Sequence, residues 1–289
     1  MVALGDSLSC GEGVGIHVEP GQTWAAQLTD AIPGASMIQM AVAGARVRDV
    51  ISHQLPRAVS QRPDLATVLV GLNDIIRSGF RPDRFRAELG VLVHSLRAAG
   101  ATVLLATLHD PGALRPLPLT KRLRRQLVAR VAIVNDTVWA LAAADDRIRV
   151  LDLAGIYDLR LLGAWEVDRV HFSPAGHRLI ADSAVRALTG SDLPEPVPLP
   201  PQRIPGAPGR PARIRWVLAC GIPWLIQHGG RVAPAALRMG VERSGRPEFL
   251  AGTGDGDAFQ PAAVQPAHGR VGAGLGEHAG TPEVAGALG

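Results

Sequence analysis

Short apolar runs alternate with longer amphipathic segments over the first 190 residues of the chain. The apolar runs have the length and β-branched content of buried strands, so we expect strands at 2–4, 36–40, 66–70, 102–106 and 148–151. The longer segments repeat apolar residues at helical spacing, so we expect helices at 23–30, 46–59, 83–99, 119–144 and 174–188. This order predicts an α/β fold with three layers, α/β/α, in which helices cover both faces of a parallel sheet.

Four short polar blocks follow the ends of predicted strands. They are Gly5-Asp6-Ser7-Leu8-Ser9, Ala43-Gly44-Ala45, Gly71-Leu72-Asn73-Asp74 and Asp168-Arg169-Val170-His171. Functional residues of parallel sheets gather beyond the carboxyl ends of the strands, so we expect Ser7, Gly44 and Asn73 to meet at one edge. The blocks contain the parts that acyl transfer needs: a nucleophile, a base, a carboxylate that orients the base, and donors for an oxyanion.

Three of these residues form the predicted catalytic triad. The hydroxyl of Ser7 is the nucleophile, and a base must take its proton. His171 is the predicted base, and Asp168, three residues earlier, can orient the imidazole through its Nδ1–H. The alternative for the first block is an ordinary turn in which Asp6 accepts backbone N–H groups. His177 is a rival base, but it has no acidic residue three positions before it, which favours a packing or capping role.

The predicted oxyanion hole takes its donors from three blocks. They are the backbone N–H groups of Ser7 and Gly44 and the side-chain amide of Asn73. Each has a structural alternative: Gly44 suits any tight turn, and Asn73 can occupy a turn whose next residue, Asp74, caps a helix.

The four blocks together resemble the GDSL family of lipases and esterases, also called SGNH hydrolases. The resemblance covers about residues 1–190. It implies a flavodoxin-like sheet and hydrolysis of a carboxylic ester through an acyl-enzyme on Ser7. It also implies that no metal and no organic cofactor is needed.

The expected partner is a small-molecule ester, with a small or short-chain acyl group. The loops at 11–22 and 110–119, which we expect to wall the acyl pocket, are short, and aromatic residues make up only 4% of the chain. Two alternatives stay open: transfer of the acyl group to an alcohol acceptor, and a catalytically silent member that binds a membrane or a partner.

Charge and cysteine content argue against a nucleic-acid-binding protein, a disulfide-rich protein and a cysteine metal site. The net charge is +4 and almost all basic residues are arginine, so the basic run at 121–125 reads as a solvated helix face and we expect no nucleic-acid partner. Cys10 and Cys220 have neither disulfide nor metal-site spacing. The first block begins at Gly5, which leaves no room for a signal peptide, so we expect a cytoplasmic protein.

The composition changes after the hydrolase-like domain at 1–190. Residues 191–211 are rich in proline and predict an extended linker. Residues 212–228 are apolar but short, and Gly221 and Pro223 interrupt them, so we expect no integral membrane association. We expect this segment to pack on the domain, with peripheral membrane or partner contact as the alternative. Residues 229–289 predict a largely disordered tail.

Overall fold

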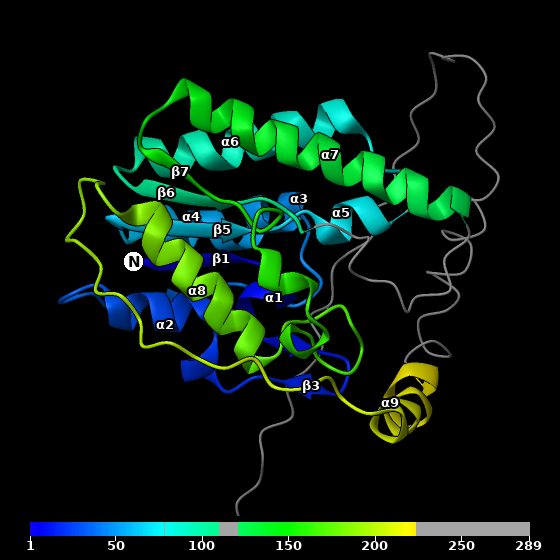
Figure 1. The fold of residues 1–289 in the computed structure, drawn as a ribbon. Helices are drawn as coiled ribbons and strands as arrows, with labels where there is room; N and C mark the ends of the chain where they lie inside the picture. The colour runs from blue at the N-terminus through cyan, green and yellow to red at the C-terminus, as the bar shows by residue number, and fades with distance from the viewer. Residues whose placement is uncertain (78, 110–120, 224–289) are drawn as a thin grey trace, which may run out of the picture. The chain divides into compact units, whose positions relative to one another are not determined.

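A computed structural model describes residues 1–77, 79–109 and 121–223 of the chain. Its centre is a five-stranded parallel sheet with the order β4-β1-β5-β6-β7 (Figure 1). The strands span Ile38–Gln39, Val2–Gly5, Leu65–Leu69, Thr102–Ala106 and Ile148–Leu151 in that order. Numbered along the sheet, this is the 2-1-3-4-5 order of flavodoxin-like folds, which confirms the predicted fold class.

Helices cover both faces of the sheet, as predicted (Figure 1). Helices α2 (Trp24–Ala31) and α8 (Pro174–Leu188) pack together on one face. Helices α6 (Pro82–Ala98) and α7 (Lys121–Ala144) lie on the other. Every residue of the central strands β5 and β6 is buried, because both of their faces meet helices.

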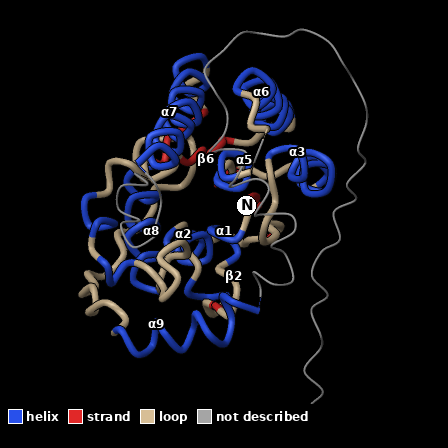
Figure 2. The backbone as a smooth tube through the Cα atoms, turned by 90° about the vertical axis from the view of Figure 1, so that its right-hand side faces the viewer, coloured by secondary structure: helices blue, strands red, loops and turns tan. Residues whose placement is uncertain are grey.

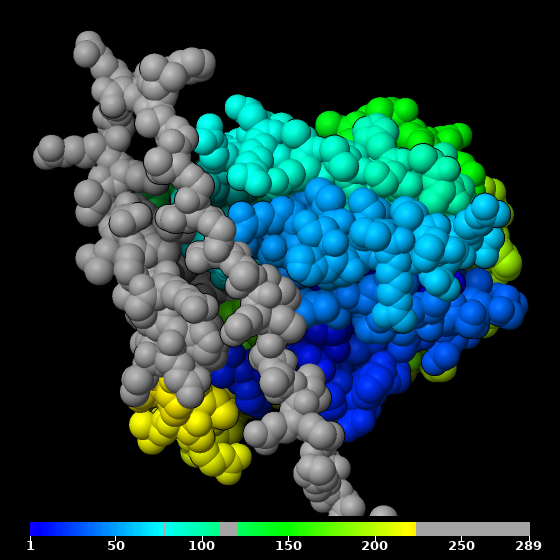
Figure 3. Space-filling model, turned by 180° about the vertical axis from the view of Figure 1, so that it is seen from behind, coloured from blue at the N-terminus to red at the C-terminus, as the bar shows by residue number. Residues whose placement is uncertain are grey.

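The helix predicted at 46–59 is divided into three parts. Helix α3 (Val47–Asp49) leads into a wider π-helical turn, Val50–Gln54, and then into α4 (Leu55–Ser60). Pro56 has no N–H to donate to the carbonyl four residues earlier, which accounts for the break in regular α geometry. Seen from behind, these residues lie next to α6 (Figure 3).

Several short elements were not predicted. Helices α1 (Ser7–Cys10) and α5 (Leu72–Ile76) directly follow β1 and β5, at the edge that faces the viewer in Figure 2. Strands β2 (Glu12–Gly13) and β3 (Ile16–His17) form a small antiparallel pair. The 3₁₀ turns span Pro20–Gln22, Tyr157–Arg160 and Leu162–Ala164. All are too short to show a period in the sequence.

The proline-rich segment at 191–209 contains no helix or strand, but it contacts the domain. Val197 N–H donates to the carbonyl of Ala31 at 2.7 Å, and Arg178 donates to the carbonyl of Pro200. Helix α9 (Arg210–Trp216) begins inside the predicted linker and continues through a π turn, Val217–Gly221. The prediction of a disordered tail at 229–289, and the end of the apolar segment at 224–228, lie outside the described residues.

Helix α7 is the one described helix that is long and apolar enough to cross a membrane, judged by length and composition alone. Its residues Val131, Val134 and Val138 are buried, and the helix contacts β7 and α6. A core helix of a globular protein passes the same test, so the expectation of no membrane span stays a prediction.

Candidate active site

The last block folds into a tight turn that holds Asp168 against His171. Arg169 has a left-handed backbone, with φ of +64°, which is uncommon for a residue with a side chain. The turn brings Asp168 Oδ2 to 2.6 Å from His171 Nδ1, and Oδ1 accepts the N–H groups of Val170 and His171 at 2.9 and 3.0 Å. The carboxylate therefore fixes the orientation of the imidazole and points its Nε2 away from Asp168.

The electrostatics keep Asp168 ionised. Burial alone would raise the pKa of its carboxyl group, but the hydrogen bond and charge of His171, with the two backbone N–H groups, hold that pKa below its ordinary value. An ionised carboxylate on Nδ1 leaves the other ring nitrogen free to accept a proton.

Ser7 is the first residue of α1, and Asp6 caps this helix. Asp6 Oδ1 accepts the N–H of Leu8 at 3.0 Å, so the turn suggested as the alternative for this block is present. Gly5 has φ of +138°, and a Cβ there would lie 2.0 Å from the carbonyl oxygen of Leu69. Only glycine fits at this last position of β1, so the turn that presents Ser7 depends on it.

Asn73 joins the third block to the first. Its Nδ2 donates to Asp6 Oδ2 at 3.1 Å and to the carbonyl of Ala45 at 3.2 Å. The Ser, Gly and Asn blocks therefore meet at one edge of the sheet, as predicted, where α1 and α5 lie (Figure 2). Gly44 has φ of +80°, and no described atom lies within 4 Å of a Cβ built on it, which leaves room for a ligand.

Asp6 is fully buried. Desolvation raises the pKa of its carboxyl group to about 6, against the opposing effects of the Leu8 N–H, the charge of His171 and the Asn73 amide. The charge of His171 therefore acts on Asp6, a residue of the first block.

Gly13 connects the His block to the Ser block. It follows α1 closely in the chain, and a Cβ on it would lie 2.6 Å from His171 Cε1. The imidazole therefore packs directly on the backbone of the glycine-rich loop. Within the described residues, no hydrogen bond joins Ser7 Oγ to His171.

Gln54 supports the turn before Ser7, and the sequence did not predict this role. Its side chain is buried and hydrogen-bonds both backbone groups of Gly5, at 2.9 Å each, directly before the Asp6–Ser7 turn. No local pattern marks this residue, because it lies 49 positions away, inside the unpredicted π turn.

His177, the rival base, has a structural position. Its Nδ1 accepts the N–H of Trp24 at 3.2 Å, at the start of α2. Burial, with a smaller effect of the His171 charge, lowers its pKa to about 3. The described ranges contain no cluster of three His, Cys, Asp or Glu side chains that could hold a metal ion.

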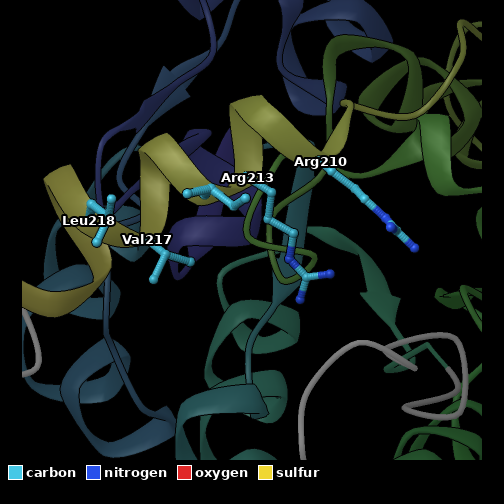
Figure 4. Close-up of a pocket in the computed structure, with 5 residues that line it drawn as sticks. Arg210, Arg213, Val217 and Leu218 are labelled. Atoms are coloured by element: carbon cyan, nitrogen blue, oxygen red, sulfur yellow. The ribbon is translucent and has the colours of Figure 1, made fainter.

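A hollow lies on α9 (Figure 4). It has a volume of about 320 Å³ and is lined by Arg210, Arg213, Ile214, Val217 and Leu218. The predicted contact of this segment with the domain is made by Trp216, whose Nε1 donates to the carbonyl of Val14 at 2.7 Å.

The sequence profile of GDSL-like lipases and acylhydrolases matches residues 3–179, which include all four blocks. The chain belongs to this family. An acetylxylan esterase of Geobacillus stearothermophilus is 24% identical over 168 residues, which are 54% of this chain and 73% of that one.

Solved structures resemble this GDSL hydrolase along its domain. TesA matches with a TM-score of 0.51 and 20% identity, over 65% of this chain and 96% of TesA. An acetyl xylan esterase, AlAXEase, matches with a TM-score of 0.51 and 19% identity, over 65% and 98%. At these identities the structural likeness shows the fold. The family and the esterase relative show an ester-bond hydrolase, which sets aside the catalytically silent alternative.

Proposed function

We propose that the chain is a serine esterase that hydrolyses small or short-chain acyl esters through an acyl-enzyme on Ser7. The observation that carries this proposal is the 2.6 Å contact between Asp168 and His171, at the sheet edge where Ser7 begins a helix. This pair supplies an oriented imidazole, and such a base is what a serine hydroxyl needs to become a nucleophile.

The proposed reaction uses these positions. Ser7 Oγ forms a bond to the ester carbonyl carbon while its proton passes to His171 Nε2. The tetrahedral intermediate collapses, the bond to the alcohol oxygen breaks, and the alcohol leaves with the proton from His171. A water molecule then attacks the acyl carbon and gives a proton to the same nitrogen. When the second tetrahedral intermediate collapses, the bond to Ser7 Oγ breaks, His171 returns the proton to Ser7 Oγ, and the acid leaves.

The negative oxygen of each intermediate would be held by the N–H groups of Ser7 and Gly44 and by the amide of Asn73. Removal of one such donor costs about 3 kcal/mol of transition-state stabilisation. Both hydrogens of Asn73 Nδ2 already have acceptors, Asp6 and Ala45. Asn73 therefore serves an oxyanion by exchanging one of these two hydrogen bonds for the new one.

Three observations support a small acyl group. The space beside Gly44 is open within the described residues, and the first loop is a short antiparallel pair, β2–β3. The curated relative is named for removal of the smallest common acyl group, acetyl. The second expected wall, residues 110–119, lies outside the described residues.

The test is hydrolysis of p-nitrophenyl esters from acetate to palmitate. We expect turnover that is highest with short chains and that Ser7→Ala abolishes, while Ser52→Ala, an exposed serine on the π turn, keeps it. A maximum at long acyl chains contradicts the proposed substrate class. Activity that persists in Ser7→Ala contradicts the nucleophile.

Acyl transfer to an alcohol is the remaining alternative, because the same acyl-enzyme can react with an alcohol in place of water. A rate of ester consumption that rises with added alcohol, with a new ester as product, would favour transfer. A rate that is independent of the acceptor favours hydrolysis.

A further inference from the structure

Arginine side chains gather in a pocket beside the proposed oxyanion hole. The pocket has a volume of about 110 Å³ and lies between the start of α3, the end of α5 and the start of α6. Its lining contains five arginines and two acids: Arg46, Arg48, Arg77, Arg81, Arg84, Asp74 and Glu88.

The acids neutralise only part of this charge. Glu88 pairs with Arg84 at 2.7 Å, and Asp49, behind the pocket, pairs with Arg46 and Arg48 at 3.2 and 3.7 Å. Among the described residues, no carboxylate forms an ion pair with Arg77 or Arg81. The pocket therefore has two guanidinium groups that form no ion pair within the described residues, although the charges of Asp49 and Asp74 act on Arg77.

The remaining acid, Asp74, ionises less readily than an ordinary aspartate. Asp74 is mostly buried, and desolvation raises the pKa of its carboxyl group to about 7, against the hydrogen bond from Val47 and the charge of Arg46. Desolvation, and then the like charge of Arg46, lowers the pKa of Arg77, and the charges of Asp49 and Asp74 oppose this effect. An anion bound in the pocket would relieve this repulsion.

The pocket adjoins the residues proposed for catalysis. Arg77 Nη2 donates to the carbonyl of Gly44 at 3.4 Å. Asp74 directly follows Asn73, and Arg46 lies two residues after Gly44. A molecule whose carbonyl oxygen rests on Gly44 and Asn73 thus has the arginine pocket next to it.

We propose that this pocket binds an anionic group of the substrate, a carboxylate or a phosphate, so that the enzyme prefers esters carrying a negative charge near the scissile bond. This rests on the proposed function. The pocket, with a volume of about 110 Å³, has room for a small anion. Arginine is suited to both ligands, because its planar N–H groups match two anion oxygens at once.

The experiment compares two esters that differ in charge, 4-acetoxybenzoate and its neutral amide, 4-acetoxybenzamide. The kcat/KM ratio of the two esters is measured for the wild type, for Arg77→Gln/Arg81→Gln and for a control, Arg57→Gln. Arg57 is exposed on α4 and does not line the pocket. Comparing ratios between variants cancels the intrinsic difference in ester reactivity.

We expect the ratio to fall at least about tenfold in the double variant, mostly through KM for the charged ester, and to stay constant in Arg57→Gln. An equal ratio in the wild type and the double variant overturns the proposal, and so does an equal loss in the control.

A second measurement separates this proposal from the proposed function. Inorganic phosphate is titrated into the same three proteins by calorimetry, which needs no turnover. Binding that the double variant loses and Arg57→Gln keeps supports the pocket even if neither ester is hydrolysed. Equal binding, or no binding, in the wild type and the double variant contradicts it.

Discussion

Gln54 and Gly5 exchange a pair of hydrogen bonds, each 2.9 Å long: the N–H of Gly5 donates to Gln54 Oε1, and Gln54 Nε2 donates to the carbonyl of Gly5. At the last residue of β1, the Gln54 side chain thus makes the hydrogen bonds that a neighbouring strand would otherwise make. The strand can end there, and the chain can turn into Asp6 and Ser7, without leaving the buried N–H of Gly5 unpaired.

Gln54→Leu tests this support. The substitution keeps the apolar volume but removes the acceptor of the Gly5 N–H, whereas the Gly5 carbonyl still accepts from Val42. We expect a loss of about 2 kcal/mol in the free energy of unfolding, measured by urea denaturation, together with reduced ester turnover. The matched control is Gln61→Leu, because Gln61 is exposed. Equal stability of the two variants would disprove the role given to Gln54.

Gly13→Ala tests the packing of the loop on His171. The added methyl group would lie 2.6 Å from the imidazole, so the ring must move, and a displacement of about 1 Å in a catalytic group can cost 10²-fold in rate. We expect kcat for p-nitrophenyl acetate to fall by at least about tenfold. Gly21→Ala is the control, since no described atom lies within 4 Å of its added methyl group. Similar kcat values in both variants would contradict the contact.

Asp168→Asn tests the orientation of the base. The asparagine oxygen can still accept the N–H groups of Val170 and His171, but its amide would donate to His171 Nδ1. The ring proton then moves to Nε2, which can no longer accept the proton of Ser7. We expect kcat to fall by roughly 10³–10⁴-fold with an unchanged circular dichroism spectrum. Asp158→Asn, at an exposed position, should keep full activity.

His177 makes stability depend on pH. Its folded pKa is about 3 against an ordinary value of 6.5, so between these values the unfolded chain binds the extra proton and stability falls as pH falls. The slope for one group is about 1.4 kcal/mol per pH unit. We expect the stability of the wild type relative to His177→Gln to drop by about 2 kcal/mol from pH 7 to pH 5.

The two buried carboxyl groups act in the opposite sense in that experiment. The raised pKa values of Asp6 and Asp74, about 6 and about 7, mean that the folded state binds protons first and gains stability as pH falls. Both proteins carry these groups, so their effect cancels in the difference. A difference that stays constant between pH 7 and pH 5 would contradict the assignment to His177.

Peripheral membrane contact through α9 is tested by flotation with vesicles that contain anionic lipid. Ile214 on α9 and Leu218 on the π turn that continues it are 61% and 62% exposed, and α9 also carries Arg210, Arg213 and Arg215. Such a helix binds at the lipid surface through apolar contact and opposite charge. With this alternative, the wild type floats and Ile214→Ser/Leu218→Ser stays in solution. Val91→Ser, which removes a 54% exposed apolar residue from α6, should float. A wild type that does not float rules the contact out.

The sheet and the His block were predictable because their signals are local. Each central strand is a continuous apolar run, as expected for a strand buried on both faces. Asp168 and His171 lie three residues apart, so one turn joins them. Periodicity also placed α6 and α8 to within a residue or two of their observed bounds.

The contacts between blocks could not be predicted in this way. Asn73 reaches Asp6 across 67 positions, and Gln54 reaches Gly5 across 49. The arginine pocket is assembled from three elements, and in the sequence its residues look like ordinary surface charge. Pairings of this kind depend on tertiary packing, and no spacing rule along the chain encodes them.

The glycine-rich loop has a different neighbour at each of three successive residues. Gly13 lies on the imidazole of His171, the carbonyl of Val14 accepts from Trp216, and Gly15 lies against Cys220. Removal of the chain after the hydrolase domain would therefore remove the contacts of Trp216 and Cys220 with the loop on which the imidazole packs. We expect kinetic constants measured on a shortened protein to differ from those of the full chain, so residues 210–223 belong in any preparation used for assays.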